Sequence, residues 1–418
     1  MTMMNGGLIP LPQLAVDGGT SVRSNPFAPW PYYEQDEIDA VTTVLRSGKT
    51  NYWTGEDGKR FEEDFARATG THHAVAVANG TVALELALYA LGIGPGDEVV
   101  TTSRTFIASA SCAVMRGAIP VVADVDPVSQ NLTADTVRAV LSPRTRAIIA
   151  VHLAGWPCDM DPILELAAER GIRVIEDCAQ AHGATYKGRP VGSFGHAAAF
   201  SFCQDKIMTT GGEGGMMVTS DKVVSERAWA YKDHGKSFEA VYRREHAPGF
   251  KWLHESFGTN WRMTNMQSAI GRVQLRKLQG WVARRRHNAA MLNDGLRKTP
   301  GLRLTQPPVE YGHAYYKYYV FIDSASLHPD WNQEQIITAI NAEGIPCFSG
   351  SCGEIYLEQA FRCAGLGPRE RLPQARRLAE SSLMLLVHPT LTDVDMRDTC
   401  MAVDKVMRAA TADGRGGM

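Results

Sequence analysis

The chain has 418 residues, of which 44% are hydrophobic and 21% charged, and its net charge is −2. This length exceeds what one compact core of ordinary size requires, so we expect one large and one small domain. The near-neutral charge gives no general field that would attract nucleic acid or an acidic membrane surface. No apolar run is long enough to span a bilayer. We therefore expect a soluble globular protein.

Eight cysteines are scattered along the chain without any C-x-x-C pair, and the first fifteen residues lack the cationic start of an export signal. We expect reduced thiols, no metal site and a cytoplasmic location. The arginine run at 284–286 falls on a predicted helix, and we interpret it as part of a solvated face.

The first part of the chain alternates helices with short apolar strands. A helix is predicted over 38–45 and ends at Gly48, a common C-terminal signal. Strands that are apolar throughout and separated by helices indicate an α/β fold, with a parallel sheet covered on both faces. Such a sheet places ligands at the carboxyl ends of its strands. The predicted strands are 73–78, 98–102, 119–125, 147–152, 173–178 and 197–202, and the predicted helices are 80–91, 105–116 and 159–170.

The second part of the chain changes character. A long helix rich in Arg and Lys is predicted over 264–298. Beyond it, residues 315–322 are aromatic-rich, and 333–343 and 371–386 look helical. We interpret this part as a smaller α+β domain, with the joint inside the long helix. The predicted division is a large domain with an N-terminal arm and a small C-terminal domain: 1–284 and 285–418.

Lys206 is the first candidate for chemistry. It follows the predicted strand 197–202 by a few residues and precedes the glycine-rich turn 211–215. Glycine lets a backbone approach a ligand closely, and burial favours the neutral amine that can attack an aldehyde. Taken alone, a surface loop lysine is the commoner case. The glycine run is not a dinucleotide fingerprint, because it lacks the G-x-G-x-x-G spacing and precedes a strand-like segment.

Three further features change that balance. Asp177 ends a predicted strand, where a carboxylate can hold a pyridine nitrogen protonated, whereas Glu176 should point to the opposite face. Gly80 and Thr81 open the helix after the first strand, and a helix N-terminus favours a phosphate. Phe106, at a strand-to-helix junction, can stack on a flat ring. Each feature taken alone has an ordinary structural explanation as a cap, a turn or a core residue. Their order along the chain, with the helix start first, then the aromatic residue, the strand-end Asp and the Lys, is a more specific signal than any one of them.

Several stretches carry a resemblance to a known family: 61–66, 79–84, 94–99, 105–106, 152–155, 176–183, 201–206, 212–215 and 258–263. Over about residues 31–388 the chain resembles the DegT/DnrJ/EryC1/StrS family of sugar aminotransferases, which depend on pyridoxal phosphate (PLP). The resemblance implies the aspartate aminotransferase-like (type I) fold. It also implies transfer of an amino group from glutamate or glutamine to a keto sugar, with a nucleotide-linked sugar as the first expectation, in amino-sugar biosynthesis.

The resemblance also implies roles for single residues. Lys206 would be the Schiff-base lysine, and Asp177 would pair with the pyridine nitrogen. Gln180 would lie near the phenolic oxygen of the cofactor, and Phe106 would stack on the opposite face of the ring. The implied phosphate ligands are Gly80, Thr81 and Ser201, with Asn260 contributed by the neighbouring subunit of a homodimer.

Two departures from the family pattern leave the acceptor open. One extra glycine stands between Lys206 and the G-E-G-G motif, and the stretch 344–352 lacks the H-Y-x-P motif of many sugar-nucleotide members. A keto-cyclitol, a keto sugar without a nucleotide and an amino-aromatic synthase activity stay possible. Dehydratases of the family carry histidine in place of Lys206, which argues against that branch. A non-catalytic regulator on the same fold is the alternative from another class, and intact Lys206 and Asp177 count against it.

Overall fold

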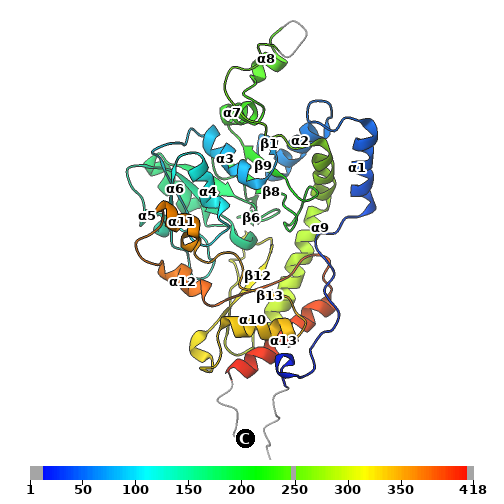
Figure 1. The fold of residues 1–418 in the computed structure, drawn as a ribbon, viewed down its shortest axis with the longest axis vertical. Helices are drawn as coiled ribbons and strands as arrows, with labels where there is room; N and C mark the ends of the chain where they lie inside the picture. Colours follow the sequence, from blue (N-terminus) through cyan, green and yellow to red (C-terminus); the bar gives the residue numbers. More distant parts are fainter. Residues whose placement is uncertain (1–12, 246–250, 412–418) are drawn as a thin grey trace, which may run out of the picture.

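The computed structural model describes residues 13–245 and 251–411. Its larger part is built on a seven-stranded sheet (Figure 1). The strands in spatial order are β1 (His73–Val77), β9 (Gly215–Thr219), β8 (Ala197–Ser201), β5 (Arg173–Asp177), β4 (Thr145–Val151), β2 (Glu98–Thr102) and β3 (Ile119–Ala123). All neighbours are parallel except β9, which runs antiparallel to β1 and β8. The predicted α/β class and mostly parallel sheet are therefore confirmed.

Helices cover both faces of this sheet, which explains why its strands are apolar throughout. In β1, Val75 and Val77 belong to one hydrophobic core and Ala76 to the other, as the alternation of a strand requires. The first core includes residues of α3 (Gly80–Ala90), α4 (Ala108–Met115) and α7 (Lys222–Lys232). The second includes residues of α2 (Asp57–Thr69), α5 (Ala134–Arg138), α6 (Met160–Arg170) and α9 (Asn265–Leu296).

The long helix α9 connects the large sheet to a separate hydrophobic core in the smaller part of the protein. Leu278 and Val282 of α9 pack in a core of the large sheet, whereas Ala289 and Leu292 pack in the core of the smaller part. This core of the smaller part lies on a four-stranded antiparallel sheet with α10 (Gln333–Ala342) and α13 (Asp393–Thr411). Its strands in order are β10 (Leu302–Leu304), β12 (Tyr318–Ile322), β14 (Ser382–Leu385) and β13 (Cys347–Phe348). The α+β character of this part is confirmed, and the division between 284 and 285 stays a prediction.

Shorter elements complete the described chain. Helix α1 (Gln35–Ser47) ends where predicted, at Gly48, whose φ is 68°. The others are α8 (Phe238–Tyr242), α11 (Gln359–Ala364), α12 (Pro373–Ala379) and a small sheet of β11 (Tyr311–Gly312), β6 (Thr185–Tyr186) and β7 (Arg189–Pro190). All eight cysteines are free thiols. Among the helices of the described residues, none combines the length and the apolarity needed to cross a bilayer.

Two expectations from the sequence are wrong. The helix predicted over 371–386 stops at Ala379, and Ser382–Leu385 forms β14 between β12 and β13. Hydrogen bonds to strands on both sides outweigh the weak helical periodicity of this short segment. The arginine run is not wholly solvated either. Arg285 is buried, and its Nη1 donates to the carbonyls of Tyr315 and Tyr316 at 3.3 and 3.2 Å.

Candidate active site

The carboxyl ends of β5 and β8 bring the predicted residues to one edge of the sheet. Asp177 is the last residue of β5 and lies opposite Ala199 of the parallel strand β8. Ser201 ends β8, and Lys206 follows in the next loop. The N-terminus of α3 meets the same edge, because a Cβ placed on Gly80 would lie 2.6 Å from the Cβ of Ser201. The strand-end rule applied to the sequence predicts a ligand at this edge, and the structure brings these residues together there.

Asp177 is a buried carboxylate with both oxygens engaged. Its Oδ2 accepts a hydrogen bond from Ser109 of α4 at 2.7 Å, and its Oδ1 accepts one from the backbone N–H of Ala179 at 3.1 Å. Burial raises the pKa of Asp177, and the hydrogen bond from Ser109 and the charge of Lys206 oppose that rise. A cationic partner in front of this carboxylate would favour its ionised form. Ser109 was missed by the sequence analysis, because a serine inside a helix gives no signal of a partner 68 residues away.

Lys206 lies in a loop that is held in place by distant residues. Its Nζ is 3.5 Å from the Oη of Tyr316 and 3.7 Å from Oδ1 of Asp205, and its side chain is 17% exposed. Tyr316 also donates a hydrogen bond to Asp205. The backbone carbonyl of Lys206 accepts from Nε1 of Trp30 at 2.9 Å. The N-terminal arm and the stretch after α9 thus both fix this lysine, although neither was expected to do so.

The start of α3 has the form of an anion cradle. Asn79 caps the helix, and its Oδ1 accepts from the backbone N–H of Val82 at 3.0 Å. The first N–H groups of a helix have no acceptor within it, and Thr81 adds a hydroxyl in the first turn. Gly215 closes the other side, where an added Cβ would come within 2.2 Å of the Asn79 carbonyl oxygen. Small residues are required on both sides of this turn.

The other three predicted cofactor residues are placed as follows. Gln180 is buried, and its Oε1 accepts from the backbone N–H of Ala154 at 2.8 Å. Phe106 lies between β2 and α4 with 65% of its surface exposed. Asn260 is exposed and belongs to a loop that bridges to Asp233. The roles of all three stay predictions.

Comparison with known proteins decides the family. The model of the DegT/DnrJ/EryC1/StrS aminotransferase family matches residues 31–404 of this chain. The chain belongs to this family.

Named relatives support the same activity. An aminotransferase from Psychrobacter cryohalolentis of known structure is 54% identical, with a TM-score of 0.90 over 92% of this chain and 100% of that one. The GDP-perosamine synthase of Caulobacter vibrioides is 38% identical over 85% of this chain and 92% of its own length. The L-glutamine:2-deoxy-scyllo-inosose aminotransferase of Streptomyces kanamyceticus is 36% identical over 95% and 97%. The protein is an aminotransferase.

Among the histidines of the family-like stretches, His152 has both ring nitrogens hydrogen-bonded within the protein. Nδ1 of His152 accepts from the backbone N–H of Cys158 at 2.9 Å, so its Nε2 carries the proton and donates to Glu176 at 3.0 Å. Burial lowers the pKa of His182 and of His388 to about 3, which favours the neutral ring in both. Glu176 points away from the Asp177 side, as predicted.

The two departures from the family pattern both lie in ordered backbone. Gly211 and Gly212 have φ values of 88° and 122°, a range that side chains rarely adopt, so the extra glycine is accommodated by backbone conformation. In the second stretch, the backbone N–H of Ser351 donates to the Oη of Tyr319 at 2.9 Å, and Gly350 packs against the same ring. Tyr319 therefore fixes the loop that stands where many members carry H-Y-x-P.

Proposed function

We propose that this aminotransferase uses PLP, held through Lys206, to move an amino group from an amino-acid donor to the ketone of a sugar-like acceptor. The proposal rests on one observation above all. A buried carboxylate, a lysine amine and a glycine-lined helix start meet at one edge of the sheet, from three separate segments of the chain.

The residues present fit this cofactor. A Cβ at position 80 would lie 2.6 Å from the Cβ of Ser201, so glycine there keeps backbone N–H groups and a hydroxyl accessible to a phosphate. Asp177 is buried with a raised pKa, and a protonated pyridine nitrogen would offset the cost of its charge. When bound, PLP would supply the electron sink that makes the α-hydrogen of an amino acid acidic.

The residues of the chain would divide the remaining tasks. Lys206 would carry the cofactor's aldehyde carbon at rest and, once released, would move a proton at its Nζ. Asp205 and Tyr316 lie close enough to orient that amine. Asp177 would keep the ring nitrogen protonated, and the hydrogen bond from Ser109 would keep Asp177 ionised. Gln180 and Phe106 would position the ring from its edge and its face.

Glutamate or glutamine is the proposed donor, and a keto sugar is the proposed acceptor. The relative from Caulobacter named as a GDP-perosamine synthase supports a nucleotide-linked sugar. A keto-cyclitol is the second candidate, because the relative named for 2-deoxy-scyllo-inosose matches almost the full length of both chains. The loop at 344–352 lacks the H-Y-x-P motif of many sugar-nucleotide members, which also supports a keto-cyclitol as the second candidate acceptor.

A panel of acceptors tests this proposal. Amino sugars linked to nucleotides and amino-cyclitols are offered in the reverse direction, and loss of the yellow colour of the bound cofactor is recorded. We expect one class to bleach the protein and the other to leave it unchanged. The variant Lys206→Ala should abolish turnover and keep the far-ultraviolet circular dichroism, whereas Lys222→Ala, with 62% of that side chain exposed on α7, should change neither. Near-normal turnover of Lys206→Ala would refute the assignment.

We further propose a homodimer in which Asn260 reaches the cofactor phosphate of the partner. The loop that carries it also exposes Trp252 and Phe257, which are 89% and 97% exposed, as expected of a surface that a second chain covers. Mixing the inactive variants Lys206→Ala and Asn260→Ala tests the sharing. Random reassociation should restore about a quarter of the wild-type activity, because half of the dimers are mixed and each has one intact site. No recovery after proven subunit exchange would refute it.

A further inference from the structure

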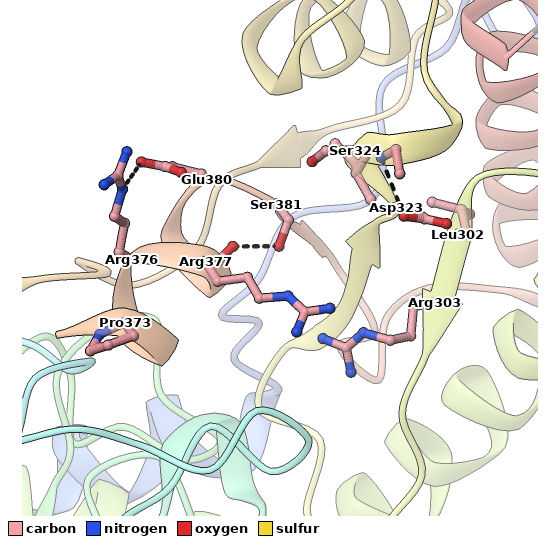
Figure 2. Close-up of a pocket in the computed structure, with 11 residues that line it drawn as sticks. Leu302, Arg303, Asp323, Ser324, Pro373, Arg376, Arg377, Glu380 and Ser381 are labelled. Atoms are coloured by element: carbon pink, nitrogen blue, oxygen red, sulfur yellow. Dashed lines mark hydrogen bonds and ion pairs between the residues drawn. The ribbon is translucent and has the colours of Figure 1, made fainter.

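A hollow of about 670 Å³ lies on the four-stranded antiparallel sheet (Figure 2). The residues that line it include none of the candidate active-site residues. It is formed by β10, by the end of β12 with the turn after it, and by α12. The lining residues are Leu302, Arg303, Ile322, Asp323, Ser324, Ala325, Pro373, Arg376, Arg377, Glu380 and Ser381. Its volume is in the range of small-molecule sites.

Arg303 is presented to this hollow by the sheet. It lies opposite Phe321 in the β10–β12 ladder, and its guanidinium stacks on that ring at 4.4 Å from the centroid. Stacking leaves the N–H edge of a guanidinium free to donate in its own plane. The half-buried Arg303 is therefore fixed with its donors available.

Arg377 approaches from the other side. It projects from α12, and Figure 2 shows its guanidinium reaching toward that of Arg303. Burial and the charge of Arg377 lower the pKa of Arg303. Within the described part of the chain neither of these two side chains forms an ion pair, whereas their neighbour Arg376 pairs with Glu380 at 2.9 Å. Two like charges thus face each other across open space.

The nearby carboxylates bind backbone N–H groups and form no ion pair with either arginine among the described residues. Oδ1 of Asp323 accepts from the backbone N–H of Ala325 at 3.3 Å. Asp126 favours the charged form of Arg303, but its Oδ1 accepts from the backbone N–H groups of Val128 and Ser129 at 2.9 and 2.7 Å. The N–H donors of Arg303 and Arg377 are therefore left for a ligand from outside.

We propose that this hollow binds a phosphate-class oxyanion between Arg303 and Arg377. Two guanidinium groups supply paired donors that match the oxygens of a phosphoryl group, and a dianion would relieve their mutual repulsion. The volume exceeds that of phosphate alone, so an organic phosphomonoester also fits. A bound anion would join β10 to α12, whose first N–H groups are held by Asp124 after β3. The site would thereby stabilise the contact between the two sheets.

Equilibrium titration of the purified full-length protein with inorganic phosphate and with ribose 5-phosphate tests the proposal, at constant ionic strength. We expect saturable binding at one site per chain in this hollow and a rise in melting temperature. Arg303→Gln and Arg377→Gln should each weaken binding at least tenfold. Arg376→Gln, on the same helix but already paired, is the matched control and should bind like the wild type. Tighter binding of ribose 5-phosphate would identify a phosphomonoester site, and equal binding a site for the phosphoryl group alone.

Three results would overturn the proposal. These are absence of saturable binding to the wild-type protein, equal affinity in all variants, and an equal loss in Arg376→Gln. Phosphate bound at the start of α3 would be unaffected by Arg303→Gln, so the two sites are distinguishable. The colour of the bound cofactor and the turnover with an amino donor should not change in Arg377→Gln, so failure here leaves the proposed transamination untouched.

Discussion

Replacing Glu176 by Gln should destabilise the fold and loosen the loop that leads into β8. The carboxylate is fully buried and accepts four hydrogen bonds. Its Oε1 accepts from the backbone N–H groups of Phe194 and Gly195, each at 2.7 Å. Its Oε2 accepts from Gly192 at 2.7 Å and from His152 at 3.0 Å. A glutamine keeps only one acceptor oxygen, so two of the four donors would face an amide NH₂ group.

The size of the effect follows from those two lost hydrogen bonds. A hydrogen bond to a charged group contributes about 1.5–3 kcal/mol, so losing two costs roughly 3–6 kcal/mol. That is a large part of the roughly 5–15 kcal/mol by which a typical native domain is stable. Urea unfolding followed by circular dichroism measures it, and Glu169→Gln, an exposed position on α6, is the matched control. A loss below about 1 kcal/mol would refute the reasoning.

The stability difference between wild type and Glu176→Gln should depend on pH with a definite sign. Burial alone raises the pKa of Glu176, but the hydrogen bonds from His152 and the backbone outweigh it and lower the pKa below the usual 4.5. A folded-state pKa below the unfolded one gives stability that is fully present above pH 4.5. That contribution is lost as the pH falls through the folded value. The stability gap between wild type and Glu176→Gln should therefore be constant near neutral pH and should narrow below pH 4.5.

Two further substitutions test the cofactor site. Ser109→Ala removes a hydrogen bond that lowers the pKa of Asp177, so the acid limb of the pH–activity profile should move to higher pH. The cofactor dissociation constant should rise about tenfold. An acid limb at the same pH as in the wild type would contradict this role of Ser109. Gly80→Ala places a Cβ 2.6 Å from Ser201, so cofactor affinity, measured by equilibrium dialysis, should fall by about 1–3 kcal/mol. Gly280→Ala is the control, since nothing lies within 4 Å of an added Cβ there.

Local sequence patterns located the elements and the strand-end residues well. The six predicted strands and the cap at the start of α3 depend on neighbouring residues, so periodicity and capping signals reveal them. β14 could not be found this way, because Ser382–Leu385 becomes a strand only through pairing with β12 and β13. The antiparallel course of β9 is likewise a property of the assembled sheet.

The supporting residues of the site were the hardest to predict. Trp30 contacts the carbonyl of Lys206 across 176 positions, and Tyr316 approaches its amine across 110. Such contacts leave no periodic trace in a single sequence. Asp205 is adjacent to Lys206, and its acidic character beside a candidate nucleophile was a signal that could have been used. Arg285 was misjudged because a run of three arginines resembles a solvated face.

Chemical trapping tests the role of Lys206 most directly. The purified protein is reduced with borohydride and digested, and the peptide that carries the pyridoxyl group is identified by mass spectrometry. We expect a single label, on Lys206. A label on another lysine, or no label on a protein that still transaminates, would contradict it.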